Sequence, residues 1–425
     1  MVLKKQKKTF QRIVVKFGGS SLADGLSISR AVKSVIKKAR QGVQLVVVVS
    51  AMGKTTDTLI DIANKACNSS ISNEDLDDIM AMGERTSARI FSAALKSLKT
   101  RSCYFDPENP NWPIITDKTF KNAKPILPLC EKMIKTHIEP LLEKDVVVVV
   151  PGFIGKTDGG AITTIGRGGS DITALILAQA LSADQVIIVT DVPGIMTADP
   201  KIIKNPEKIA EIPVDALVGL ADSGTKFIHK KALKYKHPKI DIKIISNMFG
   251  DLDSEGTIIL EDFPKNMIIE QYPNSATAVT IVGKELSKSP QIFYEILNVV
   301  NKVDTEFLGM SVNHNSIIIY LASADVENIL ETLHAIVVKT ENAIAMAVRK
   351  NLALIRIKGI ELEETPGVIS SITKTLNMKE INIYGIFTIT SSVVVFVDMK
   401  DKEKTVSLIE ETIGNNNTYS QVYGR

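Results

Sequence analysis

The chain has 425 residues, of which 44% are hydrophobic and 23% are charged, and its 51 basic residues nearly balance its 48 acidic ones. This composition is typical of a soluble globular protein, and the length corresponds to about two to four domains. A net charge of +3 does not indicate a nucleic-acid-binding or membrane-binding surface. No apolar segment approaches the roughly 20 residues of a membrane helix, and none of signal-peptide type follows the N-terminal lysines. We therefore expect a cytoplasmic protein.

The three cysteines and five histidines form no recognisable metal motif. CxxC, HxxxH and HxxE spacings are absent, and an odd number of cysteines does not favour a disulfide framework. We expect neither a zinc site nor a set of disulfides.

Short β-branched segments alternate with helical segments from Arg12 to about Leu260, which is typical of an α/β fold with a mainly parallel sheet. The valine-rich strands are apolar at every position, so helices should cover both faces of the sheet. Helices are predicted at Ser27–Arg40, which is amphipathic, and at Asp171–Leu181, which is apolar almost all round. The predicted strands are Arg12–Lys16, Gln44–Ser50, Val146–Pro151, Gln185–Thr190 and Asp241–Ser246.

The pattern changes after Leu260. Residues 276–338 predict strand, helix, strand, strand, helix, and residues 352–413 repeat this order, which is the ferredoxin-like plan. Two such units in tandem are typical of a regulatory module. We expect domains at residues 1–262, 263–340 and 341–425, with the last two sharing strands.

The segment VVKFGGSSL, residues 14–22, follows the first predicted strand. Two glycines and two serines between a strand and a helix present backbone N–H groups to an anion, and Lys16 would extend toward a transferred phosphoryl group. The alternative is an ordinary glycine-containing turn. Neither a GxxxxGK[ST] nor a GxGxxG motif is present, which argues against P-loop and Rossmann nucleotide sites.

A second glycine-rich region comprises GFIG at 152–155 and TTIGRGGSDITA at 163–174. Arg167 offers a planar fork for a carboxylate or a phosphate. Asp171 is either a helix N-cap or part of a site, and the surrounding glycines favour the site.

Two further segments offer polar groups to a nucleotide. TDVPGIMTADPK at 190–201 leaves the carboxyl end of a predicted strand, where α/β folds bind ligands, and supplies Thr190, Asp191, Asp199 and Lys201. SGTKFIHKKAL at 223–233 supplies Lys226. The alternatives are a Pro/Gly turn with solvated charges and a solvated lysine.

Together the four segments resemble the aspartate kinases of the amino-acid kinase superfamily, and the tandem C-terminal units resemble paired ACT domains. The resemblance implies an amino-acid kinase domain followed by two βαββαβ units. It also implies phosphorylation of the side-chain carboxylate of L-aspartate by ATP with Mg2+, the first step toward lysine (through diaminopimelate), threonine and methionine. The sequence departs from the family pattern at Met196, Lys201 and Lys230. These departures affect the expected contacts with the nucleotide.

The resemblance also implies the site residues. The acceptor would contact Thr56, Glu84, Phe153, Arg167, Ser170 and Asp171; the nucleotide would contact Lys16, Gly18, Gly19, Ser20, Thr190, Asp191, Lys201 and Lys226; and Lys16, Asp171 and Lys226 would be catalytic. No side chain is expected to bind a metal directly, because Mg2+ would be held through the phosphates.

The acceptor carboxylate is ionised at neutral pH, so the reaction needs no general base. Glu84 and Arg167 would bind the α-ammonium and the α-carboxylate, and Asp171 would hold Lys16 in place. The alternative for Glu84 is an ion pair with Arg85 or Arg89.

The tandem units imply feedback inhibition, with lysine as the expected effector and Glu306 and Ser311 at its site. The acid is one methylene longer than the family's aspartate. A homodimer or higher homo-oligomer would form through the same units.

Other functions remain open at this point: another amino-acid kinase, acting on glutamate or acetylglutamate, or a non-catalytic amino-acid sensor. An ACT-bearing dehydrogenase would require a dinucleotide fingerprint, which is absent.

Overall fold

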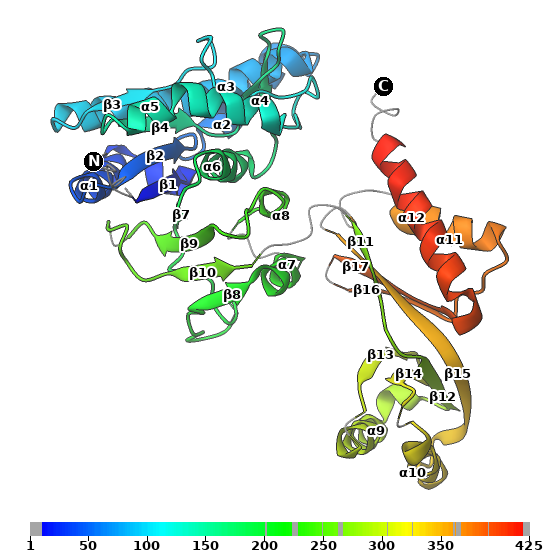
Figure 1. Cartoon of the computed structure of the whole chain (residues 1–425). Helices are drawn as coiled ribbons and strands as arrows, with labels where there is room; N and C mark the ends of the chain where they lie inside the picture. Colours follow the sequence, from blue (N-terminus) through cyan, green and yellow to red (C-terminus); the bar gives the residue numbers. More distant parts are fainter. Residues whose placement is uncertain are drawn as a thin grey trace, which may run out of the picture. The chain divides into compact units, whose positions relative to one another are not determined.

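The computed structural model describes residues 11–199, 202–222, 228–248, 250–261, 267–303, 305–324, 326–359, 362, 367–389 and 391–419 (Figure 1). The chain divides into two compact units, Met1–Lys265 and Asn266–Arg425.

The first unit is built on an eight-stranded sheet in the order β3-β4-β2-β1-β7-β9-β10-β8. All pairings are parallel except that of β9 with β10. The strands are β1 (Arg12–Phe17), β2 (Gln44–Val49), β3 (Ser102–Tyr104), β4 (Val147–Pro151), β7 (Gln185–Thr190), β8 (Glu211–Pro213), β9 (Asp241–Ser246) and β10 (Thr257–Leu260). A separate hairpin pairs β5 (Ile154–Lys156) with β6 (Ile162–Thr164).

Helices cover both faces of the four central strands. Val15, Val47 and Val149 point to one face and belong to a core that includes side chains of α1 (Gly25–Ala39) and α3 (Asn73–Ser97). The alternate valines point to the other face, where α6 (Gly169–Ala180) packs on β1, β2 and β7. Burying each valine stabilises the fold by roughly 1.5–3 kcal/mol, so coverage of both faces accounts for continuous valine runs.

The remaining helices of this unit connect the strands. They are η1 (Gly19–Leu22), α2 (Thr55–Ala66), α4 (Leu127–His137), α5 (Glu139–Leu142), α7 (Val214–Asp222) and α8 (Lys230–Leu233).

The five predicted strands of this unit are all present, with ends that differ by one residue at most. Helix α1 begins at Gly25, ahead of the predicted Ser27, because the Asp24 carboxylate accepts a hydrogen bond from Ser27 N and caps the helix. The sequence did not predict the short strands β3, β8 and β10. They contain three or four residues each, too few for a periodic pattern.

The second unit contains an antiparallel sheet in the order β13-β14-β12-β15-β17-β16, and β11 also pairs with β15. The strands are β11 (Ile268–Gln271), β12 (Ala276–Gly283), β13 (Phe307–Val312), β14 (Ser316–Ala322), β15 (Ala343–Lys358), β16 (Gly385–Ile389) and β17 (Ser392–Asp398). The helices are η2 (Leu286–Lys288), α9 (Pro290–Lys302), α10 (Glu327–Lys339), α11 (Val368–Met378), η4 (Met399–Asp401) and α12 (Lys402–Tyr419).

This unit has two halves, each with its own core. Side chains of α9 and α10 pack on β12 and β14 in one core, and those of α11 and α12 pack on β15 and β17 in the other. The fold of the whole chain is therefore a mainly parallel α/β domain followed by an antiparallel region of ACT type, as the sequence predicted.

Strand β15 belongs to both halves. Its residues from Ala343 to Leu352 pair with β12, and those from Leu352 to Lys358 pair with β17. The sequence predicted a strand only from Leu352. The preceding residues, AIAMAVRK, are rich in alanine, which is not typical of strands.

Strand β11 corrects one predicted boundary. It falls within residues 263–340, which the sequence assigned to the first ferredoxin-like unit, but it pairs with Ile355–Lys358 in the other half. The first half is thus inserted after the opening strand of the second. Four-residue strands carry too little pattern to show such a long-range pairing.

Candidate functional site

The carboxyl ends of β1, β2, β4 and β7 meet at one edge of the parallel sheet. Lys16, near the end of β1, pairs with Val48 of β2 and with Ile188 of β7. Loops that leave these ends therefore converge, which is where open α/β sheets bind ligands.

Lys16 and Asp171 form an ion pair at this edge. The Lys16 Nζ lies 2.7 Å from Asp171 Oδ1, and the side chains are only 14% and 9% exposed. The other carboxylate oxygen accepts a weak hydrogen bond from His229 N at 3.5 Å. The contact that the sequence predicted between Lys16 and Asp171 is present.

Asp171 does not cap the helix. The N-cap of α6 is Gly168, which has a left-handed backbone (φ 75°) and makes no side-chain cap, and Asp171 is the third residue of the helix. The capping alternative is therefore wrong. A carboxylate in the first turn is instead favoured by the helix dipole while it holds Lys16.

The Gly18–Gly19 turn lies against the end of β7 and the loop that follows β2. Gly18 N donates to Val189 O at 3.2 Å, and Gly53 N donates to Gly19 O at 3.1 Å. A Cβ at Gly19 would lie 2.9 Å from Ala51 O, so only glycine fits there.

These bonds correct part of the predicted phosphate cradle. Because the Gly18 amide is bonded to β7, it is not open to an anion in this structure. The amides of Gly19 and Ser20 begin η1 and have no acceptor within that helix. The available anion-binding amides thus start one residue later than expected.

Ser170 is packed against the ends of β2 and β4. Ser50 Oγ donates to Ser170 Oγ at 3.0 Å, and a Cβ at Gly152 would lie 2.7 Å from that of Ser170. Next to Gly152, Phe153 has φ 70°, a conformation that bulky residues rarely adopt. Such strain is concentrated at functional sites.

Glu84 is a buried carboxylate on α3 with an oxygen, Oε2, that has no hydrogen-bond partner among the described residues. Burial raises the pKa of Glu84 to about 7, although the backbone N–H of Ala51 opposes the rise. The neighbouring Gly83 allows close packing, since a Cβ there would lie 2.8 Å from the Ala51 Cβ and 3.2 Å from Thr56 Oγ1. Glu84 and Thr56 are thereby brought to the loop that follows β2.

A second carboxylate on the same face of α3, that of Asp77, has a structural role and serves as a comparison for Glu84. Asp77 lies two turns before Glu84, is fully buried and accepts hydrogen bonds from Lys121 N, Thr164 N and Thr164 Oγ1, each at 2.8 Å. Buried polar groups are normally satisfied in this way. The unsatisfied oxygen of Glu84 therefore indicates a ligand.

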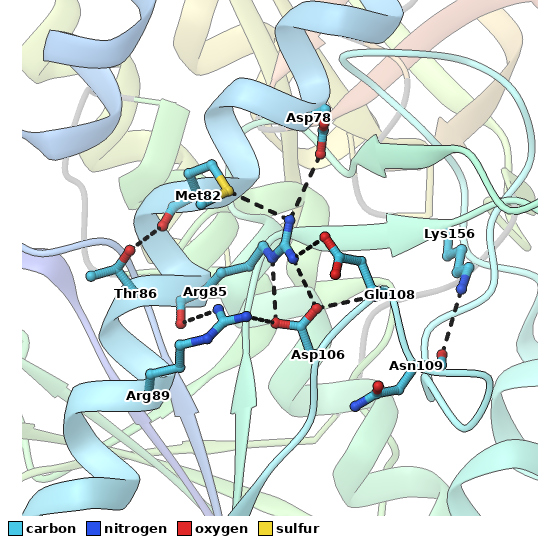
Figure 2. Close-up of polar contacts among 9 residues, drawn as sticks. All are labelled: Asp78, Met82, Arg85, Thr86, Arg89, Asp106, Glu108, Asn109 and Lys156. Carbon is cyan, nitrogen blue, oxygen red and sulfur yellow. Dashed lines mark hydrogen bonds and ion pairs between the residues drawn. The ribbon is translucent and has the colours of Figure 1, made fainter.

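The alternative for Glu84, a pair with Arg85 or Arg89, is wrong. Figure 2 shows both arginines directed to Asp106, with Arg85 Nη2 3.0 Å from Oδ1 and Arg89 Nη2 2.5 Å from Oδ2. Arg85 also contacts Glu108, at 2.5 Å. The network fastens α3 to the loop after β3, and no cation in the described part of the chain pairs with Glu84.

Arg167 is exposed between two glycines with left-handed backbones, Gly166 (φ 82°) and Gly168 (φ 75°). Its guanidinium forms no hydrogen bond or ion pair with any residue that the structure describes. The planar fork is thus available for a bidentate contact with a carboxylate.

On the side predicted to bind the nucleotide, Thr190 ends β7 and its Oγ1 donates to Asp191 Oδ1 at 3.1 Å. Asp191 is exposed, and Met196 pairs with Lys208 in a short bridge. Lys201 and Lys226 lie outside the described residues, so their predicted roles stay predictions.

Three residues that help to form the candidate site were not predicted from the sequence. Ser50 is a single polar residue after an all-apolar strand, a weak signal. Gly83 and the backbone of His229 act through close packing and an amide, and neither leaves a pattern in the sequence.

Within the described ranges, no three or more His, Cys, Asp or Glu residues are grouped so that they could hold a metal ion. No helix in those ranges combines the length and apolarity needed to cross a bilayer.

The sequence model of the amino acid kinase family matches residues 11–246. The chain is 31% identical to an aspartokinase of Geobacillus stearothermophilus over 94% of its own length and 95% of the relative's. The aspartate kinase of Synechocystis has a TM-score of 0.77 and 26% identity, and the match covers 95% of this chain and 69% of that one. Aspartokinase III of E. coli, solved with aspartate and ADP and with lysine and aspartate, shares the fold at 22% identity (TM-scores 0.51 and 0.54; 95% and 94% of this chain, 100% and 99% of those chains).

The Asp106 network predicts a loss of stability on substitution. Asp106→Asn should lower the free energy of unfolding by about 3 kcal/mol, because the buried Arg85 would keep, among the described residues, only the exposed carboxylates of Asp78 and Glu108 as charged partners. The thermal midpoint of the full chain measures this. Asp61→Asn removes the exposed pair with Lys65 (2.8 Å) and should cost less than about 1 kcal/mol. Equal midpoints for the two variants would contradict the prediction.

Proposed function

Because this chain belongs to the aspartokinases of the amino acid kinase family, we propose that the carboxyl edge of its parallel sheet is where phosphoryl transfer takes place. The chain is an aspartate kinase, which converts L-aspartate and ATP to 4-phospho-L-aspartate and ADP. The observation that supports the assignment of residues is the Lys16–Asp171 ion pair beside the glycine turn.

The chemistry needs positioning and charge neutralisation rather than a base. The acceptor carboxylate, with a pKa near 4, attacks the γ-phosphorus as an ionised oxygen, and the bond from that phosphorus to the bridging oxygen of ADP breaks. Lys16 Nζ, and the amides of Gly19 and Ser20, would stabilise the charge on the transferred group. Mg2+ would enter bound to the phosphates of ATP.

Asp171 would act on Lys16 and not on the substrate proton. Its two oxygens face Lys16 Nζ and His229 N, so the carboxylate fixes the ammonium group by a charge-assisted contact. Thr190, Asp191, Lys201 and Lys226 would bind the nucleotide on the β7 side.

The acceptor side would be formed by Glu84 and Arg167. Glu84 Oε2 is buried and unsatisfied, and it would bind the α-ammonium of aspartate, whereas the exposed Arg167 fork would bind the α-carboxylate. An N-acetylated acceptor has no ammonium and would leave Glu84 unpaired, which is costly. Thr56, Phe153 and Ser170 would complete the pocket.

The regulatory site would lie on β13. Glu306 precedes this strand, and its carboxylate accepts a hydrogen bond from Tyr272 OH at 2.6 Å. A bulge between Phe307 and Gly309 places Glu306 opposite Ala322 and Ser311 opposite Ile318, four residues apart on β14. Both residues therefore lie on one face, about 13 Å apart, and an extended diamino acid such as lysine would lie along the strand.

A homodimer would form through the same unit. From Ala343 to Asn351, β15 pairs on one edge only among the described strands, and Ile344 there is 66% exposed. An open apolar edge favours pairing with a second copy. Light scattering that gave a monomer mass at micromolar concentration would reject this.

We expect a cytoplasmic location, because ATP and free aspartate are available there, and the three free cysteines are compatible with it. Recovery of the native protein from a membrane or extracellular fraction would contradict it.

Lys16→Met should lower kcat by about 10²–10³ while the chain stays folded, because one preorganised charge at the transferred phosphoryl group is lost. Coupled detection of ADP release measures the rate, and circular dichroism monitors the fold. Lys33→Met, on the exposed face of α1, removes the same charge and should keep the wild-type rate. Wild-type turnover by Lys16→Met would show that Lys16 has another role.

The KM for aspartate should rise about tenfold per pH unit below pH 7. The raised pKa of Glu84, about 7, means that this group is protonated below that pH and must lose a proton to bind an ammonium group. Glu84→Gln should raise the KM at pH 8 and abolish its pH dependence. A KM that stays flat between pH 6 and pH 8 in the wild type and is unchanged in Glu84→Gln would exclude Glu84 as the ammonium ligand.

Lysine should inhibit the kinase by favouring one of two states of the regulatory unit. Titration of lysine, threonine and methionine in the ADP assay tests this, and Glu306→Ala should raise the lysine concentration that gives half inhibition at least tenfold without changing the uninhibited rate. No response to any of the three amino acids would disprove feedback control of this kind.

A further inference from the structure

Two buried or half-buried charges of opposite sign bridge the same pair of chain segments. Asp77 of α3 binds Lys121 and Thr164, and Lys231 of α8 binds Asn122 and Ile165, the residues that directly follow. The two segments are far apart in the chain, and the second leads into Gly166-Arg167-Gly168.

Asp77 holds the two segments through two main-chain amides and one hydroxyl group. Both of its oxygens are used: Oδ2 accepts from Lys121 N and Thr164 N, and Oδ1 accepts from Thr164 Oγ1. Burial raises the pKa of Asp77, but the hydrogen bonds from Lys121 and Thr164 oppose the rise and favour the ionised carboxylate, which fixes these groups firmly.

Lys231 holds the same segments from α8. Its Nζ donates to Ile165 O at 2.8 Å and to Asn122 Oδ1 at 2.5 Å. Its own backbone N donates to His229 Nδ1 at 3.3 Å, next to the His229 amide that faces Asp171. The lysine therefore connects the segment around Asp171 to the last carbonyl before the Arg167 loop.

The Arg167 loop rests directly on these supports. A Cβ at Gly166 would lie 2.9 Å from Lys121 O and 3.2 Å from Asn122 Oδ1, and one at Gly168 would lie 2.3 Å from the His229 Cβ. Gly166 and Gly168 allow the loop backbone to lie against these residues. They do not fix one conformation of the loop, because glycine adopts many backbone conformations. The contacts of Asp77 and Lys231 with the segments beneath the loop would restrict it to one conformation.

We propose that Asp77 and Lys231 are positioning residues that set the place of the Arg167 guanidinium and so determine selectivity for an acceptor with an α-carboxylate. The inference rests on the proposed role of Arg167. Lys231 would act through the Ile165 carbonyl rather than by contact with either substrate.

Lys231→Met is the primary test, measured by steady-state kinetics on the full chain. The KM for aspartate should rise about tenfold, the KM for ATP should stay within twofold, and Lys231→Arg should restore most of the affinity. Lys239→Met is the matched control, because Lys239 is exposed and its side chain makes no polar contact with a described residue. An unchanged aspartate KM, or an equal rise for ATP, would overturn the proposal.

A second acceptor separates positioning from general damage. The α-amide of aspartate keeps the side-chain carboxylate but lacks the α-carboxylate. Its kcat/KM should be the same in the wild type and in Lys231→Met, since Arg167 has no carboxylate to bind. An equal loss with both acceptors would show that Lys231 has only a general structural role.

The double variant distinguishes this inference from the proposed function. Arg167→Ala should raise the aspartate KM about 100-fold, and adding Lys231→Met should raise it no further, because both changes remove one interaction. A silent Arg167→Ala would refute the proposed function itself, whereas additive effects would refute only the link from Lys231 to Arg167.

Thr164→Val tests the Asp77 arm without removing the buried carboxylate. It deletes the hydroxyl that donates to Asp77 Oδ1 and conserves the volume. The aspartate KM should rise about threefold with the thermal midpoint lowered by a few degrees. A lowered midpoint with an unchanged aspartate KM would remove Asp77 from the proposal.

Discussion

The contact between Lys16 and Asp171 requires that β1 and α6 keep a fixed distance at the carboxyl edge of the sheet. The two residues are far apart in the chain, and the ammonium and carboxylate groups lie 2.7 Å apart in a largely buried position. Such a contact depends on rigid packing, since partly buried charges are stabilised only when paired with good geometry. The continuous valine core beneath β1 and α6 provides that rigidity, and the glycine turn and the Ser50–Ser170 contact are placed by the same packing.

Helix α3 shows how one element can combine support and binding. Asp77 and Arg85 are buried and paired, and they fasten the helix to two different loops. Between them, Glu84 is buried with an oxygen that no described residue contacts by a hydrogen bond, and burial raises its pKa to about 7. Burying the unpaired Glu84 oxygen destabilises the fold, and the hydrogen-bonded charges of Asp77 and Arg85 on the same helix offset this loss. Such local destabilisation is common in binding sites.

The sequence predicted the central strands well because residues such as Val47 and Val149 are apolar on both faces of the sheet. It also identified the glycine-rich segments around Lys16 and Asp171, where close backbone approach excludes most side chains. It failed where the outcome depends on distant partners. The Gly18 amide is occupied by Val189 O, and β11 pairs with the far half of β15, neither of which leaves a local pattern.

The shared strand β15 has a mechanical consequence. Its backbone passes from the β12 ladder to the β17 ladder at Leu352 with no intervening loop, so the two halves are joined by a continuous extended chain and not by a hinge. Twisting one half must bend this strand or break ladder hydrogen bonds, each worth about 1 kcal/mol. A change of sheet twist in one half should therefore be transmitted to the other half along the backbone of β15. This transmission needs no contact between the helices of the two halves.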